Sequence, residues 1–177
     1  MMFFALSLLI ISVIVIVIIA VIAPKEYIIK RSIIIDKPYI GVFSFLKFIK
    51  NQDYWSPWKK KDLNMKQEFF GVDGEVGFLA KWEGNDEVGK GEQEITFINE
   101  NDVVETELRF EKPWKSISKA IIKVEDFGLM QTKVSWIFSG YNKFPSNLFM
   151  LFYNMDKVVG KDFEEGLKSL KSLLEKE

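Results

Sequence analysis

The chain has 177 residues, contains neither cysteine nor histidine, and carries 24 basic against 25 acidic side chains. These counts exclude an imidazole base, a thiolate nucleophile, a disulfide and the usual zinc, haem or iron–sulfur ligands, so neither a metal nor a cofactor is expected. A formal charge of -1 gives no broad positive field for phosphates, and nucleic acid is not an expected partner.

The amino-terminal segment is apolar and carries no charge before Lys25. The run from Phe3 to Ala23 would form a helix about 31 Å long, which matches the hydrocarbon core of a bilayer. It lacks the basic start and the cleavage site of a secretory signal. We therefore predict a transmembrane helix over residues 1–24 and one domain over residues 25–177, with a buried core helix as the alternative for the first segment.

The charges around the predicted span indicate its orientation. Lys25, Lys30, Arg31 and Lys37 follow the apolar segment, whereas no Lys or Arg precedes it. Positive charge is enriched on the cytoplasmic side of membrane helices. We predict a single-pass membrane protein whose soluble domain is cytoplasmic.

Seven segments of the domain alternate between apolar and polar residues, as strands with one wet face do. Turn-like Asp-Gly, Gly-Asn-Asp and Asn-Glu-Asn sequences join several of them, which predicts an antiparallel sheet. The segments are Tyr27–Ile35, Lys66–Phe70, Phe78–Glu83, Lys90–Ile98, Val104–Glu111, Ser118–Glu125 and Gln131–Ser139.

Two stretches have helical spacing instead. Val42–Ile49 predicts a short helix, and apolar residues from Leu148 to Leu174 recur every three or four positions, which predicts one long amphipathic helix from Ser146 or Asn147 onward. The order of elements predicts an α+β domain in which a curved sheet wraps around the terminal helix.

The alternation also predicts which side chains face the interior. Among them Gln93, Thr106 and Ser118 are polar, and they imply either a cavity with a few polar groups or local hydrogen bonds to backbone and water. The full inward set is Phe78, Ala80, Trp82, Gln93, Ile95, Phe97, Thr106, Leu108, Phe110, Ser118, Ala120, Ile122, Val134, Trp136 and Phe138.

On the predicted long helix, Asp156 and Gly166 lie near the centre of the apolar stripe and Gly160 lies at its edge. Glycine is unfavourable inside a helix, so the pair indicates close approach to the sheet or room for a ligand. Asp156 is either an acceptor at a cavity wall or a solvated residue paired with Lys157 or Lys161.

The segment from Gly84 to Lys90 nearly matches a phosphate-binding loop. It lacks the Ser or Thr that should follow the lysine, and a strand pattern follows where a helix is needed. We predict a β-hairpin loop. The carboxylates of the next strands, on the outward side of the alternation, are expected to be solvated, and they are Glu92, Glu94, Glu105, Glu107 and Glu111.

Several short motifs together resemble membrane-anchored members of the SRPBCC superfamily, START-like proteins often labelled polyketide cyclase/dehydrase-like. The motifs are WSPW at Trp55–Trp58, Trp82-Glu-Gly-Asn85, Val88-Gly-Lys-Gly91, Phe110-Glu-Lys-Pro-Trp114, Thr132-Lys-Val-Ser-Trp136 and Gly160-Lys-Asp-Phe-Glu-Glu-Gly-Leu167. The resemblance implies a helix-grip fold, in which a seven-stranded antiparallel sheet bends around the C-terminal helix and encloses a hydrophobic cavity. It supplies no catalytic residues.

We expect the domain to bind or present a hydrophobic or amphipathic, lipid-like small molecule in this cavity without catalysing a reaction. A cyclase- or hydratase-type enzyme using Asp156 or Tyr153 is one alternative, and a protein-interaction module with a packed interior, similar to chaperone ATPase activators, is another. The predicted ligand-binding residues, with the first two at the cavity mouth, are Trp55, Trp58, Trp82, Gln93, Phe97, Thr106, Phe110, Trp136, Phe152, Met155 and Asp156.

Overall fold

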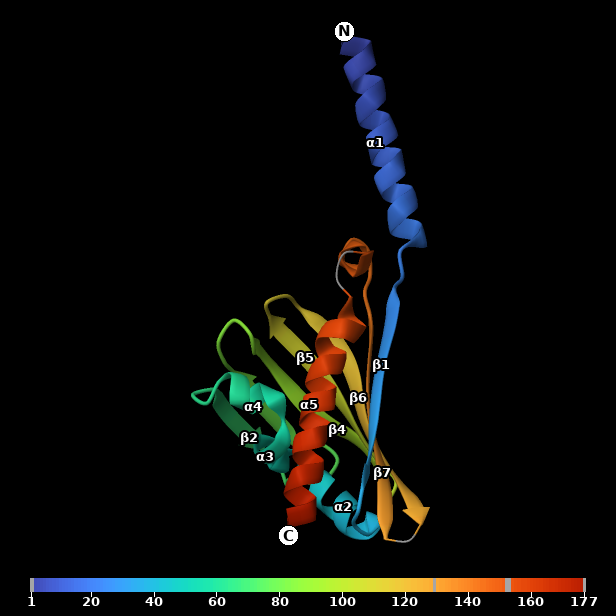
Figure 1. Ribbon diagram of the computed structural model, residues 1–177. Coiled ribbons are helices and arrows are strands. Elements are labelled where there is room, and N and C mark those ends of the chain that lie inside the picture. Colours follow the sequence, from blue (N-terminus) through green and yellow to red (C-terminus); the bar gives the residue numbers. More distant parts are fainter. Residues whose placement is uncertain (1, 129, 152–153, 177) are drawn as a thin grey trace.

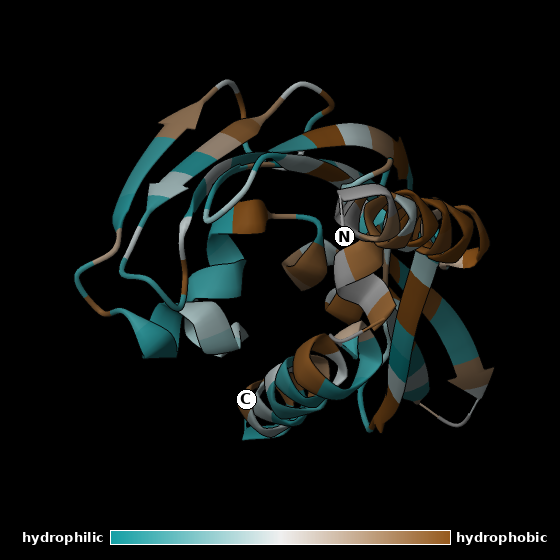
Figure 2. Cartoon of the chain, turned by 90° about the horizontal axis from the view of Figure 1, so that it is seen from above, coloured by the Kyte–Doolittle hydropathy of each residue, from teal (hydrophilic) through white to brown (hydrophobic). Residues whose placement is uncertain are grey.

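A computed structural model describes residues 2–128, 130–151 and 154–176. One helix, α1 (Met2–Ile22), projects from one end of a domain in which a curved sheet and a long carboxyl-terminal helix lie side by side (Figure 1). Seen from above, the sheet arches around that helix (Figure 2). The α+β helix-grip architecture predicted from the sequence is therefore present.

The sheet has seven strands, each antiparallel to its neighbours, in the order β1-β7-β6-β5-β4-β3-β2. All seven strand predictions are confirmed, with boundaries that differ by a few residues at most. The strands are β1 (Glu26–Ile35), β2 (Lys66–Phe70), β3 (Leu79–Glu83), β4 (Lys90–Asn99), β5 (Val103–Lys112), β6 (Ser116–Gly128) and β7 (Gln131–Tyr141).

The strands form where the sequence alternates, because one face of the sheet is buried beneath the helices. In β6, Ala120, Ile122 and Val124 are buried, whereas Lys119 and Lys123, at alternating positions, belong to the opposite face and pair with carboxylates there. The predicted inward set is correct at every position except Phe97.

Four short helical segments connect β1 to β2: α2 (Tyr39–Leu46), the 3-10 turn η1 (Ile49–Asn51), α3 (Gln52–Trp55) and α4 (Pro57–Lys61). The first corresponds to the predicted short helix, shifted toward the amino terminus. The last two were not predicted. Ser56 separates them in an extended conformation, as expected for a residue before proline, and Pro57 then occupies the first helical position, which it favours.

The predicted continuous helix from Ser146 or Asn147 is wrong, because this region contains two elements. A 3-10 segment, η2 (Ser146–Leu151), precedes the helix α5 (Met155–Lys176). Asn154 caps the second element, since its Oδ1 accepts a hydrogen bond from the backbone N–H of Lys157 at 3.0 Å. The apolar side of α5 packs against β1 and the rest of the core through Phe163, Leu167, Leu170 and Leu174.

Helix α1 presents large apolar side chains on all sides, and those that the structure describes are exposed along nearly its whole length. Its last turn contacts η2, where Asn147 Nδ2 donates a hydrogen bond to the carbonyl of Ala20 at 2.7 Å. Among the described residues, no helix combines the length and the apolar character that crossing a membrane requires.

Candidate ligand-binding cavity

A cavity of about 520 Å³ lies between the concave face of the sheet, helix α5 and the α3–α4 segment. Its wall is mostly apolar, with side chains from all strands of the sheet. Trp82, Phe110 and Ala120 lie on the sheet side, and Met155 and Phe163 belong to α5. Helix α5 packs against β1, α3 and α4, and the cavity lies between these elements and the arched sheet.

An aromatic cluster forms one wall. The rings of Trp136 and Phe163 are stacked, with centroids 4.0 Å apart and planes 7° from parallel. Trp58 lies edge-on to both, at 5.6 Å from Trp136 and 6.1 Å from Phe163. Such contacts add to the hydrophobic free energy of burial. This cluster joins α5 and α4 to β7 and forms one side of the cavity.

The two tryptophans predicted at the cavity mouth have different positions. Trp58 lines the cavity. Trp55 is buried outside the lining and lies edge-on to Trp136 at 4.9 Å, so it supports the aromatic wall from behind. Among the described residues its indole Nε1 has no hydrogen-bond partner. The prediction that Trp55 lies at the mouth is therefore wrong, because α3 turns the ring into the core.

The polar side chains at the apolar cavity wall form hydrogen-bonded pairs. Gln93 Nε2 donates a hydrogen bond to Thr106 Oγ1 at 3.1 Å. Gln93 lines the cavity, whereas Thr106 is buried behind it and holds its amide. The Tyr27 and Ser118 hydroxyls are hydrogen-bonded at 2.9 Å. Burial raises the pKa of Tyr27, and the bond to Ser118 opposes this in part, so the phenol is neutral at neutral pH.

A third polar group was not predicted from the sequence. Gln67 accepts a hydrogen bond from Lys59 Nζ at 3.0 Å and donates one to Asp53 Oδ1 at 2.9 Å, and all three residues line the cavity. Tyr27 was also missed. Strand alternation could have identified both residues. Tyr27 lies two positions before the buried Ile29 in β1, and Gln67 lies two positions before Phe69 in β2, another lining residue.

Phe97 is a corrected prediction. It is 49% exposed and lies on the outer face of the sheet. The pairing of β4 with β5 shifts between Ile95 and Phe97, so that Thr96 is an extra residue in β4. A β-bulge of this kind reverses the alternation downstream. Ile98 consequently takes the inward position and packs against the core.

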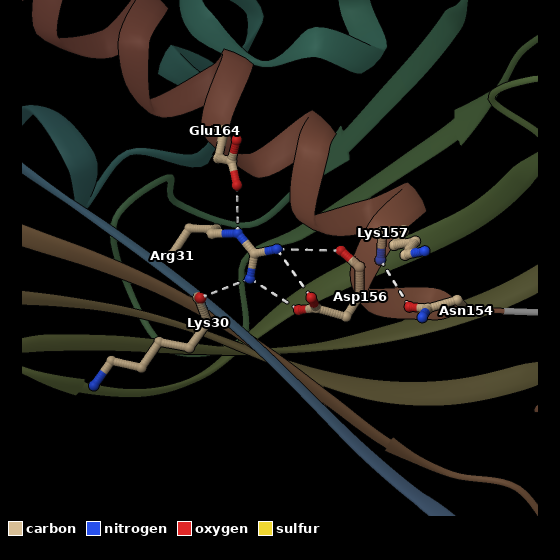
Figure 3. Close-up of polar contacts among 6 residues, drawn as sticks. All are labelled: Lys30, Arg31, Asn154, Asp156, Lys157 and Glu164. Carbon is tan, nitrogen blue, oxygen red and sulfur yellow. Dashed lines mark hydrogen bonds and ion pairs between the residues drawn. The ribbon is translucent and has the colours of Figure 1, made fainter.

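Contrary to the prediction, Asp156 lies outside the cavity lining, and its side chain faces Arg31 (Figure 3). Its carboxylate, whose side chain is 58% exposed, accepts hydrogen bonds from Arg31 at 2.8 and 3.1 Å, and Arg31 also bonds to Glu164 at 2.7 Å. The Arg31 guanidinium holds the pKa of Asp156 below its usual value. Asp156 lies seven residues before Phe163, on the same side of the helix, but it belongs to the first turn of α5, where Arg31 of β1 is its neighbour. Its partner is therefore neither Lys157 nor Lys161.

The two helix glycines serve close packing and do not enlarge the cavity. A Cβ on Gly160 would collide with the Arg31 guanidinium, and one on Gly166 would lie 3.0 Å from the Trp136 ring and 3.1 Å from Pro57. Phe152 and Tyr153, predicted as a cavity residue and as a possible catalytic residue, lie outside the described residues. The other predicted site residues that line the cavity are Trp82, Gln93, Phe110, Trp136 and Met155.

The remaining motifs have structural roles. Residues 84–89 form the turn between β3 and β4, as predicted, and Lys90 starts the next strand. The outer carboxylates are ion-paired: Arg109 contacts Glu92, Glu94 and Glu107 at 2.5 to 2.7 Å. This face of the sheet is therefore a charged surface opposite the cavity.

No protein-family model matches the chain, and no curated protein matches it. Solved structures do. Truncated norcoclaurine synthase from Thalictrum flavum matches with a TM-score of 0.65 and 8% identity, over 86% of this chain and 96% of that one. A protein from Thermobifida fusca matches with a TM-score of 0.61 and 15% identity, over 81% and 90%. The Aha1 dimer from Colwellia psychrerythraea matches with a TM-score of 0.52 and 20% identity, over 82% and 93%. At these identities the likeness shows a shared helix-grip fold, in agreement with the SRPBCC resemblance.

Proposed function

We propose that the protein binds or presents a hydrophobic or amphipathic, lipid-like small molecule inside the cavity. The observation that carries this proposal is the cavity itself. Its volume of about 520 Å³ falls within the range of roughly 300 to 1,000 Å³ typical of ligand sites. An empty apolar space of this size would forfeit many packing contacts, so a ligand that fills it has a substantial driving force.

The pattern of polar groups favours an amphipathic ligand. Gln93 and Tyr27 present hydrogen-bonding groups from β4 and β1, and the Lys59–Gln67–Asp53 group presents others from α4, β2 and α3. A few placed polar groups in an apolar wall fix the orientation of a ligand. They would bind a hydroxyl, carbonyl or acidic head group while the aromatic wall contacts an apolar body.

We further propose that α1 tethers the domain to a membrane, as in the membrane-anchored branch that the sequence resembles, with the domain on the cytoplasmic side. Support comes from the uncharged apolar sequence of α1, from its exposed side chains and from the lysines that follow it. A tethered binding domain meets membrane-dissolved ligands at a raised local concentration. The tether and the cavity therefore suit the same class of ligand.

Native mass spectrometry of the full chain, extracted from its own membrane, tests the binding proposal. A copurifying molecule is expected. The variant Ala120→Phe places a ring into the cavity and should lose that molecule, whereas the control Ile122→Phe adds bulk on the same face of β6 outside the lining and should keep it. Equal retention by both variants, or no bound molecule in the unmodified protein, would contradict the proposal.

A further inference from the structure

The segment after β7 forms a tip beside the last turn of α1 (Figure 1). Two hydrogen bonds hold it there. The backbone N–H of Asn142 donates to the carbonyl of Lys25 at 2.7 Å, and Asn147, which is fully buried, donates to Ala20 at 2.7 Å. The tip is thus fixed to the end of the helix proposed as the tether.

The tip exposes apolar side chains. Phe144 is 62% exposed, and Leu151 is also exposed. The turn between β5 and β6 adds Trp114, which is 64% exposed; it lies at the same end of the sheet, because Ser118 of β6 pairs with Gly140 of β7. Exposed apolar groups gathered in one place indicate an interaction surface.

Basic side chains accompany these apolar groups. Lys25, Lys112, Lys115 and Lys143 are all exposed at this end of the domain, with Glu26 as an acidic neighbour. Aromatic rings with adjacent lysines match the interfacial zone of a bilayer, where rings lie at the level of the head groups and lysines contact lipid phosphates. A lipid surface therefore fits both the chemistry of the tip and its place beside α1.

The same end of the domain contains an opening of the cavity. Lys112, Pro113, Trp114 and Asn142 line the cavity, and the first three are exposed to solvent. We infer that the tip, residues 142–151 together with Trp114, docks on an anionic bilayer and turns this opening toward the lipid. A ligand would then pass between bilayer and cavity without crossing bulk water. This inference rests on the proposed membrane tether.

The absence of native cysteine allows a direct test with single cysteines carrying an environment-sensitive fluorophore. The probe replaces Phe144 in Phe144→Cys, and a second probe, Leu151→Cys, guards against a local effect of the first substitution. The matched control is Phe127→Cys, a 53% exposed phenylalanine at the other end of the sheet. The eleven residues of β7 separate the two ends by about 35 Å.

The labelled full chain is reconstituted into vesicles of phosphatidylcholine with phosphatidylglycerol, and co-flotation with the vesicles is measured first. Docking predicts blue-shifted emission and quenching by spin-labelled lipid at positions 144 and 151, and water-like emission at position 127. Water-like emission at 144 and 151 in protein that floats would overturn the docking but leave the tether intact. Protein that fails to float would overturn both.

Discussion

The stacking of Phe163 on Trp136 leads to a quantitative prediction for the variant Phe163→Ala. The Phe163 side chain is 2% exposed and contacts three aromatic rings, those of Trp136, Trp58 and Phe138, at centroid distances of 4.0, 6.1 and 6.3 Å. It belongs both to the hydrophobic core and to the cavity wall. Its removal should therefore affect stability and ligand preference together.

The loss of stability can be estimated from these contacts. Truncation of a buried phenylalanine to alanine costs about 3 to 5 kcal/mol, of which part is the cavity that remains. Phe163 borders an existing cavity, so its loss widens that space and creates no new sealed void. We expect about 3 kcal/mol, the lower end of that range, for Phe163→Ala, and about 4 to 5 kcal/mol for Phe43→Ala, which is buried away from the cavity.

Denaturant unfolding of the full chain in mild detergent, followed by the near-ultraviolet circular dichroism of its tryptophans, measures both values. The widened cavity of Phe163→Ala should also shift binding toward bulkier ligands in a homologous series. A loss below about 1 kcal/mol for Phe163→Ala, while Phe43→Ala shows its full effect, would mean that the stacked pair contributes little to the stability of the fold.

Two further predictions concern the Arg31 cluster. Gly160→Ala should not give the stabilisation of about 1 kcal/mol that is usual for this change in a helix, because the new Cβ displaces the Arg31 guanidinium from its carboxylates. In an Arg31→Ala background the stabilisation should appear. Equal effects of Gly160→Ala in both backgrounds would refute this account. Asp156 has a lowered pKa, so it stabilises the fold above its ordinary value of 3.8 and loses this effect as the pH falls through the lower folded-state value. In Asp156→Asn, the unfolding free energy should depend less on pH in this acidic range, and ligand affinity should be unchanged.

The sheet was predictable because its information is local. Each strand has one buried and one wet face, so a period of two in the sequence, as at Ala120, Ile122 and Val124, specifies both the strand and the orientation of its side chains. The bulge at Thr96 was not predictable in this way. The sequence of β4 alternates as in a regular strand even though Thr96 is an extra residue. The side chain of Phe97 points to the outer face because of the backbone pairing with β5, which the sequence pattern does not show.

The predicted site shows the same difference between local and long-range information. Trp82, Gln93, Phe110 and Trp136 were placed correctly because strand alternation determines their direction. Asp156 was misplaced because a helical wheel gives the direction of a side chain but not what lies opposite it, and in the first turn of α5 that neighbour is Arg31. The partner of Asp156, Arg31, is 125 residues away in the sequence, a pairing that no local pattern contains.

Tyr27 allows a test of whether the protein catalyses a reaction of the bound ligand. Burial raises its pKa, so the phenol donates hydrogen bonds and cannot act as a base near neutral pH. Stability linked to its raised pKa is present below the ordinary value of 10.0 and is lost as the pH rises through the folded-state value. Tyr27→Phe should remove this alkaline loss, and it should cost about 1 kcal/mol at neutral pH because Ser118 loses its partner. Binding without catalysis predicts that the copurified ligand is chemically unchanged by either protein. Conversion by the unmodified protein that stops in Tyr27→Phe while affinity is retained would instead identify an enzyme with Tyr27 as its acid.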